Sequence, residues 1–343
     1  MIAKFFHAWE QRLASVTKDR VVRPFEWGLD WIEANGRSRE APPETILLDW
    51  ASRALSDSQK FFDTPDTSDY TFKPQTGGAT GALSFPSPMR TPHPENNTVH
   101  ALYFRNAQAT KGRRAVVVLP QWNADPSGHV GLCHLLNRFG LSALRLTLPY
   151  HDARRPQELN RADYIVSSNV GRTMQVCRQA VMDTRRAVAW LHKQGYDRIG
   201  ILGTSLGSCL SLLTAAHEPL IRAQALNHIS PYFADVVWRG LSTQHVRTGL
   251  DGHVDLDTLR TMWLPISPQM YLDRVKDKKT LLVYAKYDLT FPVDLSQNLI
   301  REFEQRSIPH EIVILPCGHY STGVAPFKYL DGFVLARFLD RNL

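Results

Sequence analysis

Residues 198–207 read Arg-Ile-Gly-Ile-Leu-Gly-Thr-Ser-Leu-Gly, and a helical pattern begins directly after them. The first half is an apolar run typical of a buried strand, and Gly203 to Gly207 has the form G-x-S-x-G. Between a strand and a helix, the two glycines allow a sharp turn that lifts the Ser205 hydroxyl above the edge of a sheet. The N–H of Leu206 then points to where a carbonyl oxygen would gain negative charge. This stretch therefore predicts a serine nucleophile on a strand–helix turn.

Around this stretch, apolar strand patterns alternate with helical patterns from about residue 97 onward. Strands are expected at 99–105, 114–119, 141–148, 198–202, 223–229, 280–284 and 310–315, and helices at 163–193, 206–217, 293–306 and 327–339. This alternation predicts an α/β fold with a mostly parallel central sheet and helices on both faces. Ligand sites of such sheets lie in the loops after the carboxyl ends of the strands, so candidate residues are sought there.

The first 96 residues have a different character. Six apolar side chains at helical spacing predict a helix over 2–18 that packs on the protein body: Ile2, Phe5, Phe6, Trp9, Leu13 and Val16. Residues 64–94 are rich in Pro and Gly and are interpreted as a connector with turns, one of them at Gly77-Gly78. We expect a helical N-terminal extension and connector over 1–96 and a catalytic domain over 97–343. The extension could cover the sheet edge, form part of a lid or build a homodimer.

Composition excludes several protein classes. The chain has 343 residues, of which 43% are hydrophobic and 21% charged, too apolar for a disordered protein. No apolar run approaches the roughly 18 residues of a spanning helix, and the first ten residues do not form a signal peptide. The four cysteines are widely spaced without a CxxC pair, which is typical of free thiols in a reducing compartment. A cytoplasmic protein is expected.

The formal charge of +7 comes almost entirely from residues 111–343, which hold 28 Lys and Arg against 20 Asp and Glu. No tract there combines clustered basic residues with interleaved aromatic residues, so no nucleic-acid partner is expected. A solvated basic surface is the simplest interpretation, and preference for an anionic small-molecule substrate is the alternative.

A serine hydroxyl is a weak nucleophile, so Ser205 needs a base and an acid that orients the base. Asp288 directly follows a buried strand, whereas Asp294 opens the next helix and is better explained as a first-turn acid. His319 lies in a turn after the last strand, whereas His310 begins that strand. The order Ser205, Asp288, His319 therefore predicts a catalytic triad.

From residue 97 onward the chain resembles the α/β-hydrolases. The segment 267–275, Ser-Pro-Gln-Met-Tyr-Leu-Asp-Arg-Val, is similar to the equivalent stretch of dienelactone-hydrolase and prolyl-oligopeptidase-like members. The segment 148–156, Leu-Pro-Tyr-His-Asp-Ala-Arg-Arg-Pro, resembles a loop of the group called alpha/beta hydrolase domain-containing protein 18. The resemblance implies a serine hydrolase that uses no cofactor.

The resemblance also implies a second oxyanion donor in the loop after the strand 114–119. Many members carry His-Gly there, whereas this chain has Leu119-Pro120. If Leu119-Pro120 takes the place of His-Gly, the backbone N–H of Gln121 is the expected second donor, beside the N–H of Leu206. The N–H of Trp122 is the second choice for this donor. Pro120 has no N–H to donate.

Several residues are candidates for substrate binding. His151 and Arg154 follow the strand 141–148, where they could contact a carboxylate or phosphate or simply tether the loop. The insertion 231–266 is unusually aromatic and is expected to cap the pocket, with Tyr232 and Trp238 against the substrate beside Trp122. Its aspartates do not have the spacing of a calcium loop, so no metal is expected.

These residues together predict hydrolysis of a carboxylic ester through an acyl-enzyme. A peptidase or an acyltransferase would use the same triad. A binding protein that has kept the fold without turnover is the rival outside the enzymes, because the oxyanion loop departs from the common pattern.

Overall fold

The computed structural model describes residues 2–32, 41–75, 79–106 and 113–343, so the predicted turn at Gly77-Gly78 lies outside the described residues. The described chain forms a nine-stranded sheet in the order β1-β2-β3-β5-β4-β6-β7-β8-β9. The strands are β1 (Thr71–Pro74), β2 (Gly81–Pro86), β3 (Thr98–Phe104), β4 (Arg114–Leu119), β5 (Ser142–Leu146), β6 (Arg198–Thr204), β7 (Ile221–Asn227), β8 (Lys279–Ala285) and β9 (Glu311–Leu315). Six neighbouring strands of the sheet run parallel, as the sequence predicts; in sheet order they are β5, β4, β6, β7, β8 and β9.

The sheet begins earlier in the chain than expected. β1 and β2 pair antiparallel within the segment 64–94, and β2 pairs with β3 to extend the sheet at one edge. The interpretation of this segment as a connector missed both strands. β1 has four residues and ends at Pro74, which is too short to give an alternating pattern, whereas β2 does alternate and buries Leu83 and Phe85. The strands of the sheet therefore start before the boundary expected at residue 97.

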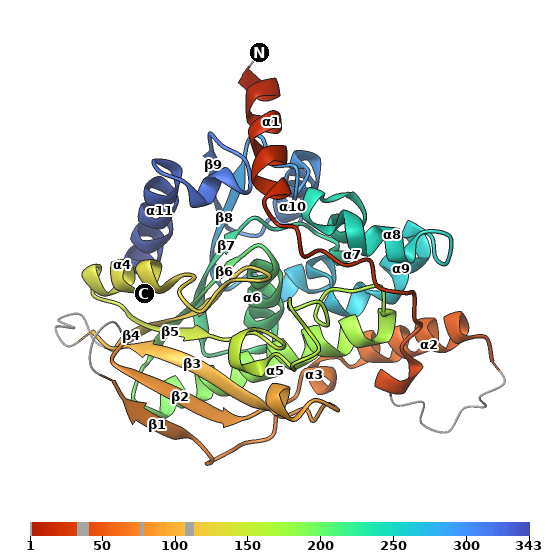
Figure 1. Ribbon diagram of the computed structural model, residues 1–343. Coiled ribbons are helices and arrows are strands. Elements are labelled where there is room, and N and C mark those ends of the chain that lie inside the picture. The colour runs from red at the N-terminus through yellow and green to blue at the C-terminus, as the bar shows by residue number, and fades with distance from the viewer. Residues whose placement is uncertain (1, 33–40, 76–78, 107–112) are drawn as a thin grey trace.

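Helices cover both faces of the sheet (Figure 1). They are α1 (Ile2–Ser15), α2 (Pro43–Ser56), α3 (Ser58–Phe61), α4 (Val130–Arg138), α5 (Val170–Lys193), α6 (Leu206–His217), α7 (Phe233–Arg239), α8 (Gln244–Leu250), α9 (Leu256–Met262), α10 (Val293–Gln305) and α11 (Phe327–Asn342). α5 begins seven residues later than predicted, where the Asn169 side chain accepts a hydrogen bond from the Arg172 N–H and caps the helix.

The central strand β4 shows how the two faces are built. Val117 and Leu119 belong to an apolar cluster shared with α2, α5 and α6, whereas Val116 and Val118 belong to a second cluster shared with α4 and α11. Successive side chains of a strand point to opposite faces, so a continuous apolar run fits a strand that is covered on both sides.

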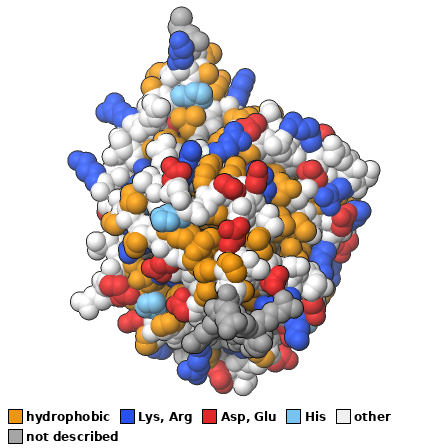
Figure 2. Space-filling view, turned by 90° about the vertical axis from the view of Figure 1, so that its right-hand side faces the viewer, with side chains coloured by type: hydrophobic (Ala, Val, Ile, Leu, Met, Phe, Trp, Pro, Cys, Tyr) orange, Lys and Arg blue, Asp and Glu red, His pale blue; other side chains and the backbone are white. Residues whose placement is uncertain are grey.

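Helix α1 packs on the body through only part of its predicted apolar stripe. Phe6 stacks on Tyr287 with 4.5 Å between ring centroids, but the side chains of Ile2, Phe5 and Val16 are exposed. The helix stands out from the body in Figure 1, and its tip is at the top of the face in Figure 2. Basic and acidic side chains are interspersed over that face.

Two further expectations concern the class of protein. Among the helices of the described ranges, none is long and apolar enough to span a bilayer. All four cysteines have free thiols, as expected, and all four are buried.

Candidate active site

Ser205 lies on a strained turn between β6 and α6. Its backbone angles, φ of 57° and ψ of −119°, fall in a region that residues other than glycine rarely adopt. The turn closes tightly because a Cβ on Gly203 would lie 2.1 Å from the Gly207 carbonyl oxygen, and one on Gly207 would lie 2.2 Å from that of Leu119. Both glycines of G-x-S-x-G are therefore required by close backbone contact, which also brings the loop after β4 against the start of α6.

Asp288 follows β8 and faces two histidines. Its Oδ1 accepts hydrogen bonds from the N–H groups of Thr290 and Phe291 at 2.8 and 2.7 Å. Its Oδ2 lies 3.0 Å from His319 Nδ1 and 2.9 Å from Nδ1 of His228, which follows β7. The structure thus brings together the predicted acid and base. It adds His228, which directly follows β7; the sequence pattern places this residue inside the expected strand 223–229 and contains no signal for a role at the site.

The groups around Asp288 shift the pKa values of the carboxyl and of both imidazoles. Burial favours a raised pKa for the Asp288 carboxyl, but the facing His319 and His228 imidazoles outweigh burial and hold the pKa well below its usual range. Burial would lower the pKa of His319, but the Asp288 carboxylate raises it above the ordinary value of 6.5. Burial together with the neighbouring His319 lowers the pKa of His228 below its ordinary value.

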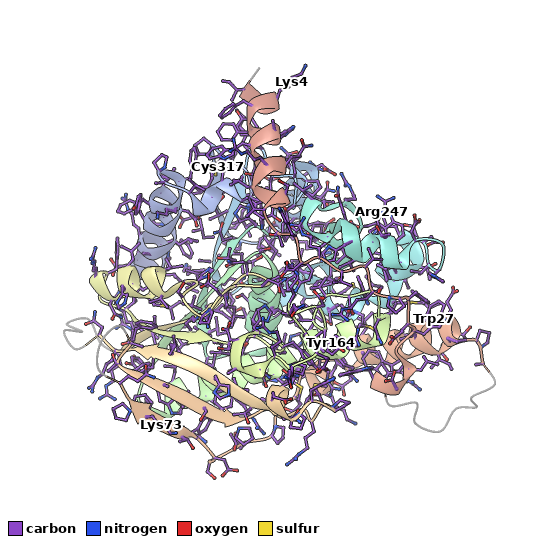
Figure 3. All side chains as sticks on the ribbon, viewed as in Figure 1. Lys4, Trp27, Lys73, Tyr164, Arg247 and Cys317 are labelled. Atoms are coloured by element: carbon purple, nitrogen blue, oxygen red, sulfur yellow. The ribbon has the colours of Figure 1, made fainter. Side chains whose placement is uncertain are left out.

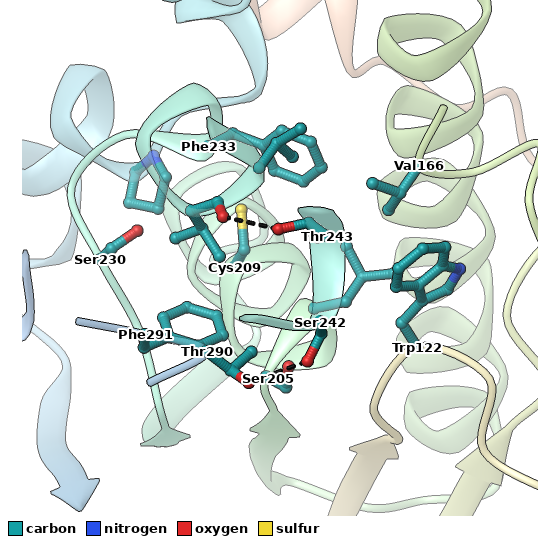
Figure 4. A pocket seen from close by; sticks show the side chains of 14 residues that line it. Trp122, Val166, Ser205, Cys209, Ser230, Phe233, Ser242, Thr243, Thr290 and Phe291 are labelled. Carbon is teal, nitrogen blue, oxygen red and sulfur yellow. Dashed lines mark hydrogen bonds between the residues drawn. The ribbon is translucent and has the colours of Figure 1, made fainter. Parts of the chain in front are cut away.

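Ser205 borders two cavities. The first is an apolar slot of about 60 Å³ whose lining includes Phe233, Val236 and Val237 of α7 and Phe291 (Figure 4). The second is a vestibule of about 1050 Å³ that is also lined by His319 and His228. Trp122 and Ser242 line both cavities, so the two meet at Ser205.

The vestibule carries charged groups of both signs. Its lining includes Arg20, Arg161 and Lys328 and one acid, Asp331. Burial raises the pKa of the Asp331 carboxyl to about 7, while a hydrogen bond from Asn227 Nδ2 opposes this shift. A polar substrate portion therefore fits the vestibule better than the slot.

The loop after β4 lies beside the nucleophile. Gln121 and Trp122 line the vestibule, and neither N–H donates to an acceptor within the described part of the chain. The Asn123 N–H donates to His151 Nε2 at 2.9 Å, while His151 Nδ1 lies 2.9 Å from the Pro149 carbonyl oxygen. His151 is buried, with its pKa lowered by burial to about 4, so a neutral ring supports this loop instead of lining either cavity.

Arg154 does not lie at either cavity. It is fully buried, and its Nη2 lies 2.8 Å from Asp183 Oδ2 on α5. The Arg154 guanidinium also donates to the carbonyl oxygens of Asn96 and Thr147. This corrects the expectation of a substrate contact: the arginine forms a buried ion pair that ties the loop after β5 to helix α5.

Replacing Arg154 by Ala is expected to lower the free energy of unfolding by about 3–5 kcal/mol, because Asp183 would remain as an uncompensated buried acid. Urea denaturation measures this loss. Arg155→Ala is the matched control, since Arg155 is exposed and its loss should change stability by less than about 0.5 kcal/mol. Equal stability of the two variants would contradict a stabilising role for the ion pair.

The insertion 231–266 forms α7, α8 and α9, and α7 contributes a wall of the slot. Tyr232 and Trp238 do not line either cavity; they lie under the guanidinium groups of Arg260 and Arg247 at 5.3 and 5.1 Å. This corrects their predicted contact with substrate. On a short helix Phe233 and Val237 share the inward face, which turns Trp238 away.

The competing candidates have other contacts. Asp294 forms an ion pair with Arg239 at 2.7 Å on the surface, and His310 Nδ1 lies 2.8 Å from the Ile308 carbonyl oxygen. Cys317 lies two residues before His319 and so competes with Ser205 as a nucleophile, but it is buried against Thr322 Oγ1, and burial raises the pKa of its thiol to about 11. This environment does not produce a thiolate nucleophile.

His228, Asp288 and His319 could also present one ligand atom each to a metal ion, since these atoms lie within 4.8 Å of one another. The Nδ1 atoms of both histidines already face the carboxylate, so a cation would have to displace these contacts. The arrangement suits a carboxylate that orients the His319 ring better than it suits metal binding.

Comparisons with known proteins address the fold. No protein-family model matches the sequence, and no curated protein matches it. Among solved structures, an acylaminoacyl peptidase from Pyrococcus horikoshii aligns over 80% of this chain with a TM-score of 0.60 and 14% identity. This chain spans only 42% of that peptidase.

Two esterases align over nearly their whole length. The alignment with acetyl xylan esterase 1 from Thermoanaerobacterium sp. JW/SL YS485 includes 96% of this chain and 98% of the esterase. The two chains are 16% identical, and the TM-score is 0.58. The alignment with an acetyl xylan esterase from Paenibacillus sp. R4 includes 92% of this chain and 99% of that esterase, at 13% identity and a TM-score of 0.60. The topology and these similarities confirm the fold predicted from the sequence: the chain has the α/β-hydrolase fold.

Proposed function

We propose that the chain is a serine hydrolase that cleaves carboxylic esters of short acyl groups through an acyl-enzyme. The observation that carries this proposal is that Ser205, on its strained turn, and His319, held by Asp288, line one cavity. The activities named for the similar acetyl xylan esterases support an ester substrate.

In the proposed reaction, Ser205 Oγ attacks the ester carbonyl carbon while His319 Nε2 accepts the hydroxyl proton. Asp288 keeps the other ring nitrogen protonated and stabilises the imidazolium that forms. The N–H groups of Leu206 and Gln121 donate to the oxyanion. His319 then protonates the leaving alcohol, and water releases the acid from Ser205.

The different sizes and linings of the two cavities support different places for the two halves of the substrate. A site of roughly 10–15 Å³ holds one water molecule, so the 60 Å³ slot fits an acyl chain of only a few carbon atoms. The larger, polar vestibule suits the alcohol. We therefore place the acyl group against Phe233 and Val237 and the leaving alcohol beside His319.

The test of this proposal combines active-site labelling with a series of esters. A fluorophosphonate probe is expected to label the wild-type protein rapidly and to leave Ser205→Ala unlabelled. Among p-nitrophenyl esters, kcat/KM should be highest for acetate to butyrate and fall for octanoate. Val237→Ala, which lengthens the slot, should move the preference toward longer chains.

Three outcomes would count against the proposal. A folded wild-type protein that is neither labelled nor active would favour the non-catalytic binding protein. Faster cleavage of acyl-peptides than of any ester would favour a peptidase, and acyl transfer to an alcohol in preference to water would favour an acyltransferase. A preference for octanoate would contradict the assignment of the slot to the acyl group.

A further inference from the structure

Helix α1 carries a buried carboxylate. Glu10 is fully buried, although other residues of this helix are exposed. Its Oε2 accepts a hydrogen bond from the Tyr320 N–H at 2.8 Å, and its Oε1 accepts from the N–H and the hydroxyl of Ser321 at 2.9 and 2.7 Å. Burying an acid is costly unless it is hydrogen-bonded, and these three donors supply the bonds.

All three donors belong to the two residues that directly follow His319. On the other side of His319, a Cβ on Gly318 would lie 2.3 Å from Glu10 Cδ, so only glycine lets the carboxylate approach this closely. The Gly318 N–H donates to Ser321 Oγ at 2.8 Å, which closes the turn. Glu10 therefore contacts the backbone on both sides of the proposed catalytic histidine.

The same helix also touches the strand end that carries the proposed acid. Phe6 stacks on Tyr287, the residue before Asp288, with an interplanar angle of 7°. Trp9 packs 6.4 Å from Phe327 at the start of α11. In Figure 3, Cys317, two residues before His319, lies at the base of α1. One helix thus braces the loops of both Asp288 and His319.

We propose that Glu10 is a positioning residue for His319 and that the N-terminal helix is part of the active site. This inference rests on the proposed function. A turn without regular structure leaves a side chain free to move, and displacement of a catalytic group by about 1 Å can cost about 100-fold in rate. Three hydrogen bonds that the turn donates to Glu10 of the helix fix the turn where such displacement matters most.

The test compares three variants of the full chain. In Glu10→Gln an amide N–H₂, which is itself a donor, faces the backbone or hydroxyl donors of the turn, so hydrogen bonds are lost. We therefore expect kcat for p-nitrophenyl acetate to fall about 10- to 100-fold with KM unchanged. Glu10→Asp keeps an acceptor pair and should recover part of the loss. Arg12→Gln removes a charge from the exposed face of the same helix and should retain wild-type kcat.

A second readout needs no turnover. The His319 Nδ1 proton, hydrogen-bonded to Asp288, should give a far-downfield NMR resonance in the wild type that broadens or disappears in Glu10→Gln. Thermal denaturation identifies any variant that is unfolded at the assay temperature. If folded Glu10→Gln keeps both the resonance and wild-type kcat, Glu10 only anchors the helix and the inference is wrong.

The two proposals fail in different ways. A wild-type protein with no Ser205-dependent turnover or labelling would overturn the proposed hydrolase. The resonance would still decide whether Glu10 holds His319 in place, because it reports the Asp288–His319 contact directly.

Discussion

Ser205→Ala and His319→Ala are each expected to lower kcat for p-nitrophenyl acetate by on the order of 10⁶-fold, with little change in KM, and the double variant should lose no more than either single variant. The two residues act as one unit, because the hydroxyl is a poor nucleophile without its base and the base has no other proton to take. Residual catalysis should come from the oxyanion donors and from binding.

Single-turnover measurements with titrated active sites would test this expectation. His310→Ala is the matched control, because His310 lies at the start of β9 with its ring against Phe303, and its loss should leave kcat unchanged. If the losses of the two single variants multiplied in the double variant, Ser205 and His319 would be acting independently, and the proposed mechanism would be wrong.

The sequence was sufficient to predict the fold and to place the candidate residues at one edge of the sheet, because both depend on regular patterns. Parallel strands bring their carboxyl ends to one edge, so the residues after β6, β8 and β9 had to lie near one another. The topology brings the loops of Asp288 and His319 together, and their side chains meet at 3.0 Å.

The parts that could not be predicted depend on contacts between residues far apart in the chain. Helical periodicity places Glu10 on the polar face of α1, yet it is buried because donors 310 and 311 residues later satisfy its oxygens. Arg154 follows a strand like a substrate-binding residue, but Asp183 on α5 pairs with it. The local sequence identifies a charged side chain but does not reveal which distant residue will form its ion pair or hydrogen bond.

The same reasoning explains the errors in the cap. The aromatic insertion was expected to cap the pocket, and residues of α7 line the slot. Which aromatic side chains face inward depends on the position and phase of this helix, which is only seven residues long. Phe233 lines the slot, and its neighbour Tyr232 does not. Composition identifies such a segment, but the side chains that face the pocket can be identified only from the position of the helix in the structure.

Asp288→Asn is expected to lower kcat about 10⁴-fold while leaving the fold intact. The N–H groups of Thr290 and Phe291 would hold the amide oxygen, which turns the amide N–H₂ toward His319. His319 would then have to accept at Nδ1 and carry its proton on Nε2, where it could not take the proton of Ser205. Asp294→Asn is the control, since that carboxylate pairs with Arg239 on the surface and should not affect kcat.

The same variant makes a prediction about pH. His319 works as a base only when neutral, and the Asp288 carboxylate raises its pKa above 6.5. Wild-type kcat/KM should therefore rise with pH and have a midpoint above 6.5, because protonated His319 is inactive below its pKa. Removing the charge in Asp288→Asn lowers the pKa of His319, so the remaining activity should have its midpoint at lower pH. A midpoint that does not move, measured with p-nitrophenyl acetate across the range in which the protein stays folded, would show that Asp288 does not control the protonation of His319.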